Sequence, residues 1–379
     1  MKITNIEAIP VNVPLKDGMT TKTSHGIHAT SPYVIIQVHT DSGLIGLGEA
    51  TVAPRWSGET SASCTAAIEG LICDTLTGMN PLNIQQCQYR MERVIKGNPF
   101  TKAAVEMALW DLLGKHCNEP VCRLLGGSVH EALPIRMVIG SYDVPQALAL
   151  AKQFIGEGTR CLKVKVGLDP LADIERVEAI RNFAGPDIPI SVDANCGWTF
   201  DQAQRTIREL EQFDLLFVEQ PIATDSPEQL AELRCRSNIP IMADESNFTT
   251  ANALDLIRRD AVDILSVYPG KHGGILNTLK ITALAAAAGI KCAVGSNLEL
   301  GIGTAAMLHV GSTQLVIDST TYPGDFIGPL YHVHDLLTEP LSLGPPAAIV
   351  PDSAGLGVTL DHDALQRFKD DNASHISLG

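Results

Sequence analysis

Residues 188–193 read Ile-Pro-Ile-Ser-Val-Asp, an apolar run that ends on a carboxylate. Such a run is typical of a strand buried on both faces, and similar runs recur from residue 135 onward between segments of helical spacing. This alternation predicts βα units and a parallel sheet. The runs cover residues 135–139, 161–166, 188–192, 216–218, 241–243, 264–267, 291–294 and, more weakly, 315–317. Eight strands predict an α/β fold, a TIM-type (β/α) barrel over residues 128–330.

The segment before the barrel has a different pattern of apolar and polar residues. Residues 3–13 alternate between apolar and polar, and residues 33–39 and 44–49 form a pair of runs across the turn Asp41-Ser42-Gly43, which predicts an antiparallel meander. Three helical patterns follow, at residues 61–76, 84–95 and 101–115. We therefore expect an α+β domain over residues 1–127. Residues 331–379 are rich in Pro turns, and we expect them to pack back on this first domain.

The length, charge and cysteine content of the chain exclude several classes of protein. The 379-residue chain suits a large barrel plus a smaller domain, and its net charge of −15 without a Lys/Arg cluster argues against nucleic acid as a partner. No apolar stretch reaches 18 residues and no secretory leader precedes the first strand, so we expect a cytoplasmic protein that does not enter membranes. The nine scattered cysteines show no zinc spacing and are expected to be reduced.

Polar residues end the apolar runs, and these positions form the candidate site. In (β/α) barrels the active site lies at the carboxyl ends of the strands. From Lys165 the successive steps are 28, 26, 25, 24 and 31 residues, about one βα unit each. The residues that share this placement are Lys163, Lys165, Asp193, Glu219, Asp244, Tyr268 and Glu299.

Three successive carboxylates in this set predict a metal site. Asp193, Glu219 and Asp244 supply hard oxygen ligands around one point, which suits Mg²⁺, with Mn²⁺ as the other possibility, and does not suit zinc. The alternative is that each carboxylate caps the helix that follows it, since Asp is a good N-cap residue. Three such residues in consecutive units favour the metal.

The pair Lys163 and Lys165 predicts a base. Side chains alternate along a strand, so both lysines lie on one face, and two ammonium groups beside a metal disfavour each other's charge. A metal bound to a substrate carboxylate would stabilise the enolate that forms when the neighbouring carbon loses a proton. No GxGxxG follows a strand, which argues against hydride transfer. A Schiff-base aldolase and a non-catalytic barrel protein stay as alternatives from other classes.

Two loops of the first domain are candidate lids. Residues 14–31 are polar and without a period, which is long for a structureless connection, and Trp56 lies in a second loop. A mobile surface hairpin is the alternative for the first loop. Farther along, Gly301-Ile302-Gly303 precedes an Ala-rich helix and is either an anion-binding turn or a simple turn.

Taken together, these motifs resemble the enolase superfamily and, within it, the muconate lactonizing enzyme subgroup of the mandelate racemase/muconate lactonizing enzyme family. The likeness covers essentially the whole chain. Its most specific parts are Lys163-Val164-Lys165, Val192-Asp193-Ala194-Asn195, Val218-Glu219-Gln220-Pro221 and Ala243-Asp244-Glu245-Ser246, with Leu124-Leu125-Gly126-Gly127 and Phe326-Ile327-Gly328-Pro329-Leu330 in support.

The resemblance implies a fold and a set of roles. The first domain would cap a modified, enolase-like barrel. Asp193, Glu219 and Asp244 would hold Mg²⁺, Lys165 would be the acid/base with Lys163 as its electrostatic neighbour, and Glu299 would lie at the barrel mouth. Contacts to a small carboxylate substrate are expected from Thr20, His25, His28, Trp56, Asn195, Lys271 and Asn297. Barrels of this kind often form homo-oligomers.

One position departs from the subgroup. A second lysine, on the opposite face of the substrate, precedes a Gly-Gly pair by five positions there, whereas Tyr268 holds that place here and Lys271 lies in what looks like a loop. Racemases and epimerases need a base on each face, so Tyr268 favours one-base chemistry. The leading hypothesis is a syn lactonisation of muconate type, followed by β-elimination from a hydroxy acid, and then by racemisation or epimerisation. Tyr268 would be an acid, an oriented donor or a wall.

Overall fold

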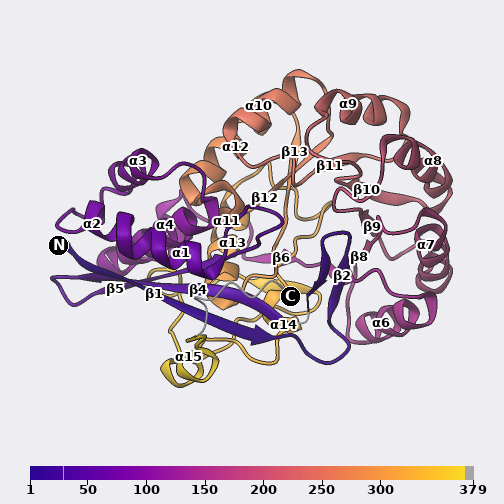
Figure 1. Cartoon of the computed structure of the whole chain (residues 1–379). Helices are drawn as coiled ribbons and strands as arrows, with labels where there is room; N and C mark the ends of the chain where they lie inside the picture. The colour runs from indigo at the N-terminus through magenta and orange to yellow at the C-terminus, as the bar shows by residue number, and fades with distance from the viewer. Residues whose placement is uncertain (29, 372–379) are drawn as a thin grey trace.

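The computed structural model describes residues 1–28 and 30–371, and it has a capping domain beside a barrel (Figure 1). The capping domain holds a three-stranded antiparallel sheet with the order β1-β4-β5, which confirms the predicted meander. Its strands are β1 (Ile3–Pro14), β4 (Thr30–Thr40) and β5 (Ile45–Thr51).

Helices cover one face of this sheet. The first predicted helix is a continuous segment with a π-helical turn in its middle, and the other two follow the prediction within a few residues. Helix α4 lies so close to β5 that a Cβ on Gly46 or Gly48 would meet backbone oxygens of α4 at 2.1 and 1.8 Å, so only glycine fits at both positions. The helices are α1 (Ser61–Ala67), the π turn η1 (Ile68–Ile72), α2 (Cys73–Leu76), α3 (Ile84–Val94), α4 (Pro99–Cys117) and α5 (Val121–Leu124).

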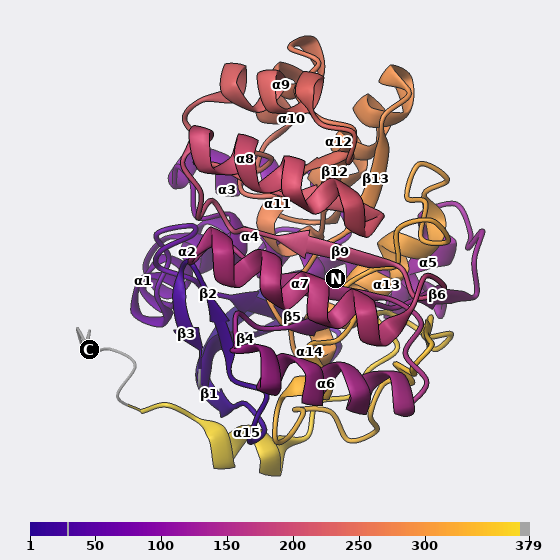
Figure 2. The same cartoon turned by 90° about the vertical axis from the view of Figure 1, so that its right-hand side faces the viewer.

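Seven parallel strands follow each other in spatial order around the barrel, from β7 to β13. In Figure 2 the first outer helices stack side by side on the face toward the viewer. The strands are β7 (Met137–Ile139), β8 (Leu162–Lys165), β9 (Ile190–Asp193), β10 (Leu215–Glu219), β11 (Ile241–Ala243), β12 (Ile264–Val267) and β13 (Lys291–Val294). The helices are α6 (Val144–Gly156), α7 (Pro170–Ala184), α8 (Phe200–Leu210), the 3₁₀ turn η2 (Glu211–Phe213), α9 (Pro227–Arg236), α10 (Thr250–Arg258), α11 (Pro269–His272), α12 (Ile275–Ala288) and α13 (Gly301–Thr313).

The expected eighth strand at residues 315–317 is absent from the described part of the chain. Leu315 is exposed, and Ile317 forms only an isolated bridge with Cys292 of β13. The barrel is closed instead by an irregular segment around Gly324, which bridges Ile135 ahead of β7, and by Asp325, whose N–H donates to Val294 of β13. Residues 315–317 were misassigned because a run of three apolar residues is too short to distinguish a strand from a turn.

Carboxylates of the capping domain hold two barrel helices by their N-termini. Glu106 of α4 accepts hydrogen bonds from the N–H groups of Ile275 and Leu276 at the start of α12. Glu49 of β5 accepts from the N–H groups of Leu300 and Gly303 at the start of α13. A helix N-terminus attracts anions because its N–H groups are unpaired. The glycine-rich turn at residues 301–303 therefore binds the protein's own carboxylate.

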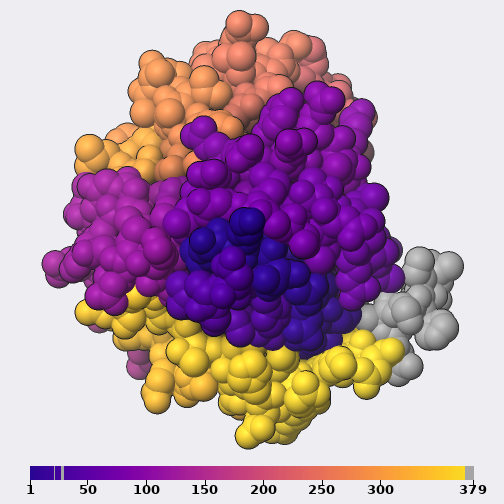
Figure 3. All heavy atoms as spheres, turned by 90° about the vertical axis from the view of Figure 1, so that its left-hand side faces the viewer, coloured from indigo at the N-terminus to yellow at the C-terminus, as the bar shows by residue number. Residues whose placement is uncertain are grey.

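The C-terminal segment contacts the first domain. Lys369 forms a bridge with Val11 of β1 and Gly355 with Pro120, whereas strand β14 (Ala347–Ile349) pairs with β6 (Ala132–Pro134) just after this domain. Figure 3 shows this yellow segment beside the indigo strands. Helices α14 (Gly328–Tyr331) and α15 (His362–Phe368) complete it, and residues 372–379 lie outside the described residues. No helix among the described residues combines the length and apolar character that crossing a bilayer requires.

A short hairpin occupies the stretch in which the sequence shows no period. Strands β2 (Thr21–Thr23) and β3 (Gly26–His28) pair antiparallel through three residues each. The middle of residues 14–31 is therefore a hairpin, which the alternative interpretation of this stretch allowed, and its two strands were not predicted from the sequence. Three-residue strands are too short to produce a visible alternation.

Candidate active site

A cavity of about 160 Å³ lies between the capping domain and the carboxyl ends of the barrel strands. Both domains contribute to its wall. The candidate residues that line it are His25, Trp56, Lys163, Lys165, Asp193, Asn195, Asp244 and Asn297. The other described candidates, Thr20, Glu219, Tyr268, Lys271 and Glu299, are not in this lining, and the side chain of His28 lies outside the described residues.

Lys165 has its ammonium group fixed in the cavity wall. Its Nζ donates to Asp193 Oδ2 at 2.6 Å and to Asn195 Oδ1 at 2.9 Å. Asn195 is itself oriented, because its N–H donates to Asp193 and its side-chain amide donates to Glu245 at 3.0 Å. Lys165 thus lies at the cavity with a defined direction for its proton.

Lys163 lies beneath Lys165 in a network that sequence reasoning did not find. Its Nζ donates to Asp325 Oδ2 at 2.5 Å and to Glu219 Oε2 at 3.2 Å. Arg136 donates to the same Asp325 carboxylate through Nε and Nη2. Burial would lower the pKa of Lys163, but Asp325 and Glu219 outweigh burial and raise it, so this group stays cationic. Asp325 precedes the motif at residues 326–330, and it was overlooked because no apolar run leads to it.

The three strand-end carboxylates lie at the ends of the neighbouring strands β9, β10 and β11. Glu219 is the register partner of Asp193, and Lys163 Nζ lies 3.2 Å from Glu219 and 3.7 Å from Asp193. Helices α8 and α10 are capped by Thr199 and Thr249, so Asp193 and Asp244 do not serve as their caps. That removes the main structural alternative for these two residues.

The carboxylates differ in their electrostatic surroundings. Burial would raise the pKa of Asp193, but Lys165 and Lys163 outweigh it and hold this pKa below its usual value. Burial raises the pKa of Glu219 to about 8, because Lys163 offsets only part of the lost hydration and Asp193 adds repulsion. Buried carboxylates that share a site in this way favour an additional cation.

The donor chemistry of this set fits a hard divalent cation. All three groups are carboxylates, the ligands that Mg²⁺ and Mn²⁺ prefer. Within the part of the chain that the structure describes, their oxygens are not among those that meet within 4.8 Å of one another. Each carboxylate is turned toward a lysine, so binding a cation would require these side chains to rotate.

Tyr268 and Lys271 lie on the side of the barrel opposite Lys165 in strand order. Tyr268 is fully buried, and its hydroxyl has no hydrogen-bond partner among the described residues. Lys271, predicted in a loop, is in the short helix α11 and is fully buried. Its three donors reach Asp244 Oδ1, Asp244 O and Ser266 O, which leaves none for a substrate.

The β2–β3 hairpin closes over the strand ends. Ser24 Oγ donates to Asn195 O at 2.5 Å, His25 Nε2 contacts Glu245 Oε1 at 3.0 Å, and Lys22 O accepts from the N–H of Ser141 at 2.9 Å. The hairpin tip therefore contacts the loops after three barrel strands, as a lid would.

An aromatic wall stands beside this hairpin. The Trp56 ring lies 6.1 Å from Tyr268, 6.1 Å from Phe100 and 6.2 Å from Phe248 between ring centroids. Asn297 is held by a hydrogen bond to Thr51 O, and Glu299 accepts from Ser296 and from the N–H of Asn297. Glu299 therefore orders the loop that carries Asn297.

Comparison with known proteins gives the same architecture. Residues 146–364 match the family described as "Enolase C-terminal domain-like", and residues 5–126 match the N-terminal domain of mandelate racemase / muconate lactonizing enzyme. The chain belongs to the mandelate racemase / muconate lactonizing enzyme family of the enolase superfamily. This confirms the capping domain and enolase-like barrel that the motifs predicted.

Relatives within this family catalyse different reactions. The N-succinyl-L-Arg/Lys racemase of Bacillus cereus is 32% identical and covers 97% of this chain and 98% of its own. A chloromuconate cycloisomerase of Cupriavidus pinatubonensis is 34% identical, with 97% and 99% covered. The crystal structure of a dipeptide epimerase from Cytophaga hutchinsonii, complexed with Mg and D-Ala-L-Val, matches with a TM-score of 0.92, 32% identity and 97% and 99% covered. The chain is therefore an enolase-superfamily isomerase.

Proposed function

We propose that this enzyme is a muconate-type cycloisomerase that moves a single proton through Lys165. The observation that carries the proposal is the asymmetry of the site. Lys165 lines the cavity with an oriented ammonium group, whereas the position expected for a second base holds Tyr268, outside the cavity lining. Lys271, the nearest alternative, donates all its protons to protein oxygens.

The reaction would proceed on one face of a small unsaturated diacid. One carboxylate oxygen of the substrate adds to the remote double bond, and negative charge develops on the other carboxylate as an enolate. Lys165 then delivers its proton to the α-carbon from its fixed place beside Asn195. Lys163, kept cationic by Asp325 and Glu219, supports the developing negative charge at close range.

Asp193, Glu219 and Asp244 would hold a magnesium ion, with manganese as the other fitting cation. When bound, the cation would neutralise the substrate carboxylate and draw charge off the enolate. Lys165 would then exchange its hydrogen bond to Asp193 for the substrate and keep the one to Asn195, while Lys163 would stay paired with Asp325. The Mg²⁺ in the related dipeptide epimerase complex supports this assignment.

Racemisation is the second candidate function. It is favoured by the similarity to the N-succinyl-L-Arg/Lys racemase and to a dipeptide epimerase. It would require a second base on the face opposite Lys165, and neither Tyr268 nor Lys271 supplies a free one here. β-Elimination from a hydroxy acid needs only one base, but no relative described above favours it.

Proton NMR with Mg²⁺-loaded enzyme tests the proposal. Muconates, chloromuconates, hydroxy acids, N-succinyl amino acids and dipeptides are offered separately. We expect lactone formation from a muconate, lost on EDTA treatment and reduced by at least about 10³-fold in Lys165→Ala. Lys152→Ala, an exposed lysine of α6, is the control. Turnover by Lys165→Ala near the wild-type rate would remove Lys165 from the mechanism.

A further inference from the structure

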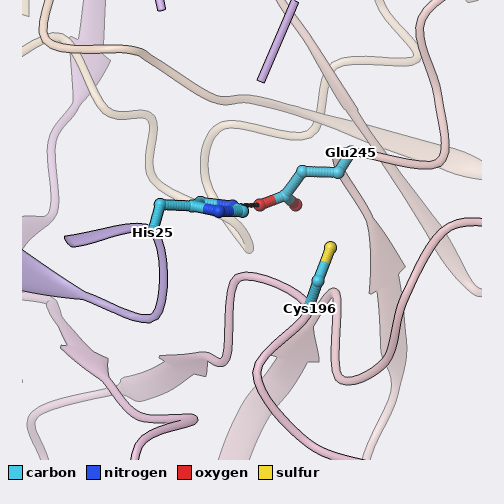
Figure 4. Close-up of side chains that lie close together, drawn as sticks. All are labelled: His25, Cys196 and Glu245. Carbon is cyan, nitrogen blue, oxygen red and sulfur yellow. Dashed lines mark hydrogen bonds and ion pairs between the residues drawn. The ribbon is translucent and has the colours of Figure 1, made fainter. Parts of the chain in front are cut away.

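Three side chains outside the strand-end carboxylates converge where the lid meets the barrel. His25 comes from the turn of the β2–β3 hairpin, whereas Cys196 and Glu245 come from the loops after β9 and β11 (Figure 4). One ligand atom of each residue lies within 4.8 Å of the others. Among the described residues, His25, Cys196 and Glu245 are the three potential ligands that meet at this spacing.

Glu245 has an oxygen available for a ligand. Its Oε1 is already occupied by His25 Nε2 and Asn195 Nδ2, both at 3.0 Å. Its Oε2 is buried and has no hydrogen-bond partner among the described residues, although the side chain is only 4% exposed. A buried carboxylate oxygen without a partner costs free energy unless something fills its place.

The surroundings favour a cation at this point. The carboxylates of Asp193, Asp244 and Asp225 all act electrostatically on Cys196, in addition to Glu245. Arg55 lines the same surface cavity, and its guanidinium donates a hydrogen bond to the backbone oxygen of His25. The three residues also line one surface cavity, so an ion can enter from solvent.

We propose that His25, Cys196 and Glu245 form a second cation site, for a borderline divalent ion such as Zn²⁺, whose occupancy fastens the hairpin lid to the barrel. One nitrogen, one sulfur and one oxygen form a ligand set typical of zinc and cobalt, and Mg²⁺ disfavours sulfur. Tetrahedral zinc places its ligands roughly 3.3 to 3.8 Å apart, given its usual bond lengths. A small contraction of these side chains meets that spacing, and water would supply the fourth ligand.

This site shares no ligand with the strand-end carboxylates, although His25 also lines the cavity that holds Lys165. Its effect would be on the lid. A cation bound at once to His25 of the capping domain and to two barrel loops would hold the hairpin closed and slow the entry and release of substrate. Zinc would therefore inhibit the enzyme by occupying a place outside the reacting groups.

Cobalt titration of the full-length protein in saturating Mg²⁺ tests the site, since cobalt bound to a thiolate gives a sulfur-to-metal charge-transfer band. We expect one equivalent of Co²⁺ to produce this band, and Cys196→Ser to abolish it. Cys235→Ser, which removes an exposed cysteine of α9, should leave it intact. No band in the wild type, or a band that survives Cys196→Ser, would overturn the proposal.

A second variant tests the lid without altering the barrel loops. His25→Ala removes only the hairpin ligand and should weaken Co²⁺ affinity on the order of 100-fold. In hydrogen-deuterium exchange, Zn²⁺ should slow the amides of residues 21–28 in the wild type and leave them unchanged in His25→Ala. Equal zinc protection in both proteins would show that the hairpin takes no part in the site.

Discussion

The negative charge of Asp244 is paired with Lys271 and would also bind the proposed cation. The Asp244→Asn variant keeps an oxygen for the buried ammonium group of Lys271 but removes the negative charge that a divalent cation needs. We expect Mg²⁺ affinity to fall on the order of 100-fold or more, with the fold retained. Isothermal titration calorimetry measures this, with the exposed Asp187→Asn as control. Unchanged affinity would exclude Asp244 as a ligand.

Tyr268 lies where a second base is expected, and removing its hydroxyl oxygen tests its role. Its hydroxyl is buried without a partner, and burial, followed by repulsion from Asp244, raises its pKa well above the usual value. We therefore expect Tyr268 to act as a wall beside Trp56 and not as a proton donor. We expect Tyr268→Phe to keep activity within about twofold and to gain about 1 kcal/mol in unfolding free energy, because an unsatisfied polar group is removed.

Steady-state turnover and chemical denaturation are measured for the wild type and for Tyr268→Phe. A loss of more than about tenfold in kcat with unchanged stability would instead assign the Tyr268 hydroxyl to proton transfer.

Helix α12 begins on a carboxylate of another domain, so the stability of the whole fold depends on this contact. Glu106 accepts from the N–H groups of Ile275 and Leu276 and from Trp110 Nε1. Glu106→Ala would leave these buried donors unpaired, and we expect the free energy of unfolding to fall by about 2 to 4 kcal/mol. Urea denaturation measures this, with the exposed Glu69→Ala on the capping domain as control. Equal midpoints for the two variants would contradict this account of the domain interface.

The strand ends of the barrel could be predicted from sequence because each strand is buried on both faces. An apolar run that stops at a polar residue therefore marks where the strand reaches the site, as at Asp193 and Glu219. Asp325 could not be found in this way, because the segment that carries it closes the barrel without forming a strand. Its partner Arg136 lies inside an apolar run and gave no signal of its own.

Lys271 shows a second limit of sequence reasoning. Its spacing from Gly273 shows that Lys271 is not at the position expected for the second base. The spacing does not reveal which oxygens its ammonium group reaches. The structure pairs it with Asp244 and Ser266. The convergence of His25 with Cys196 and Glu245 was equally invisible, because it depends on how the hairpin folds over loops more than 170 residues away.

At the scale of the whole molecule, His309 joins three parts of the chain. Its Nδ1 accepts from the N–H of Cys122 at the end of the capping domain, and its Nε2 donates to Leu356 O in the C-terminal segment. The first bond requires the neutral ring, because a protonated Nδ1 has no lone pair with which to accept. Burial lowers the pKa of His309 to about 4 from its usual 6.5.

Acid should therefore loosen the assembly of the domains. The unfolded chain binds a proton at His309 below pH 6.5 and the folded chain only below pH 4, so stability falls as pH drops through this window, by on the order of 3 kcal/mol. Thermal unfolding between pH 7 and 4 measures the slope. We expect a shallower slope in His309→Gln than in wild type, and no change in the exposed His116→Gln. Identical slopes for all three proteins would contradict this role.

The fate of the transferred proton shows whether Lys165 is the single base. Magnesium-loaded enzyme turns over a muconate in D₂O, and the deuterium in the lactone is located by NMR; N-succinyl amino acids and dipeptides are treated in parallel. We expect one deuterium at the α-carbon, on one face, and no inversion of the amino-acid derivatives. Deuterium uptake with inversion at their α-carbon would contradict it, because that outcome requires a second base.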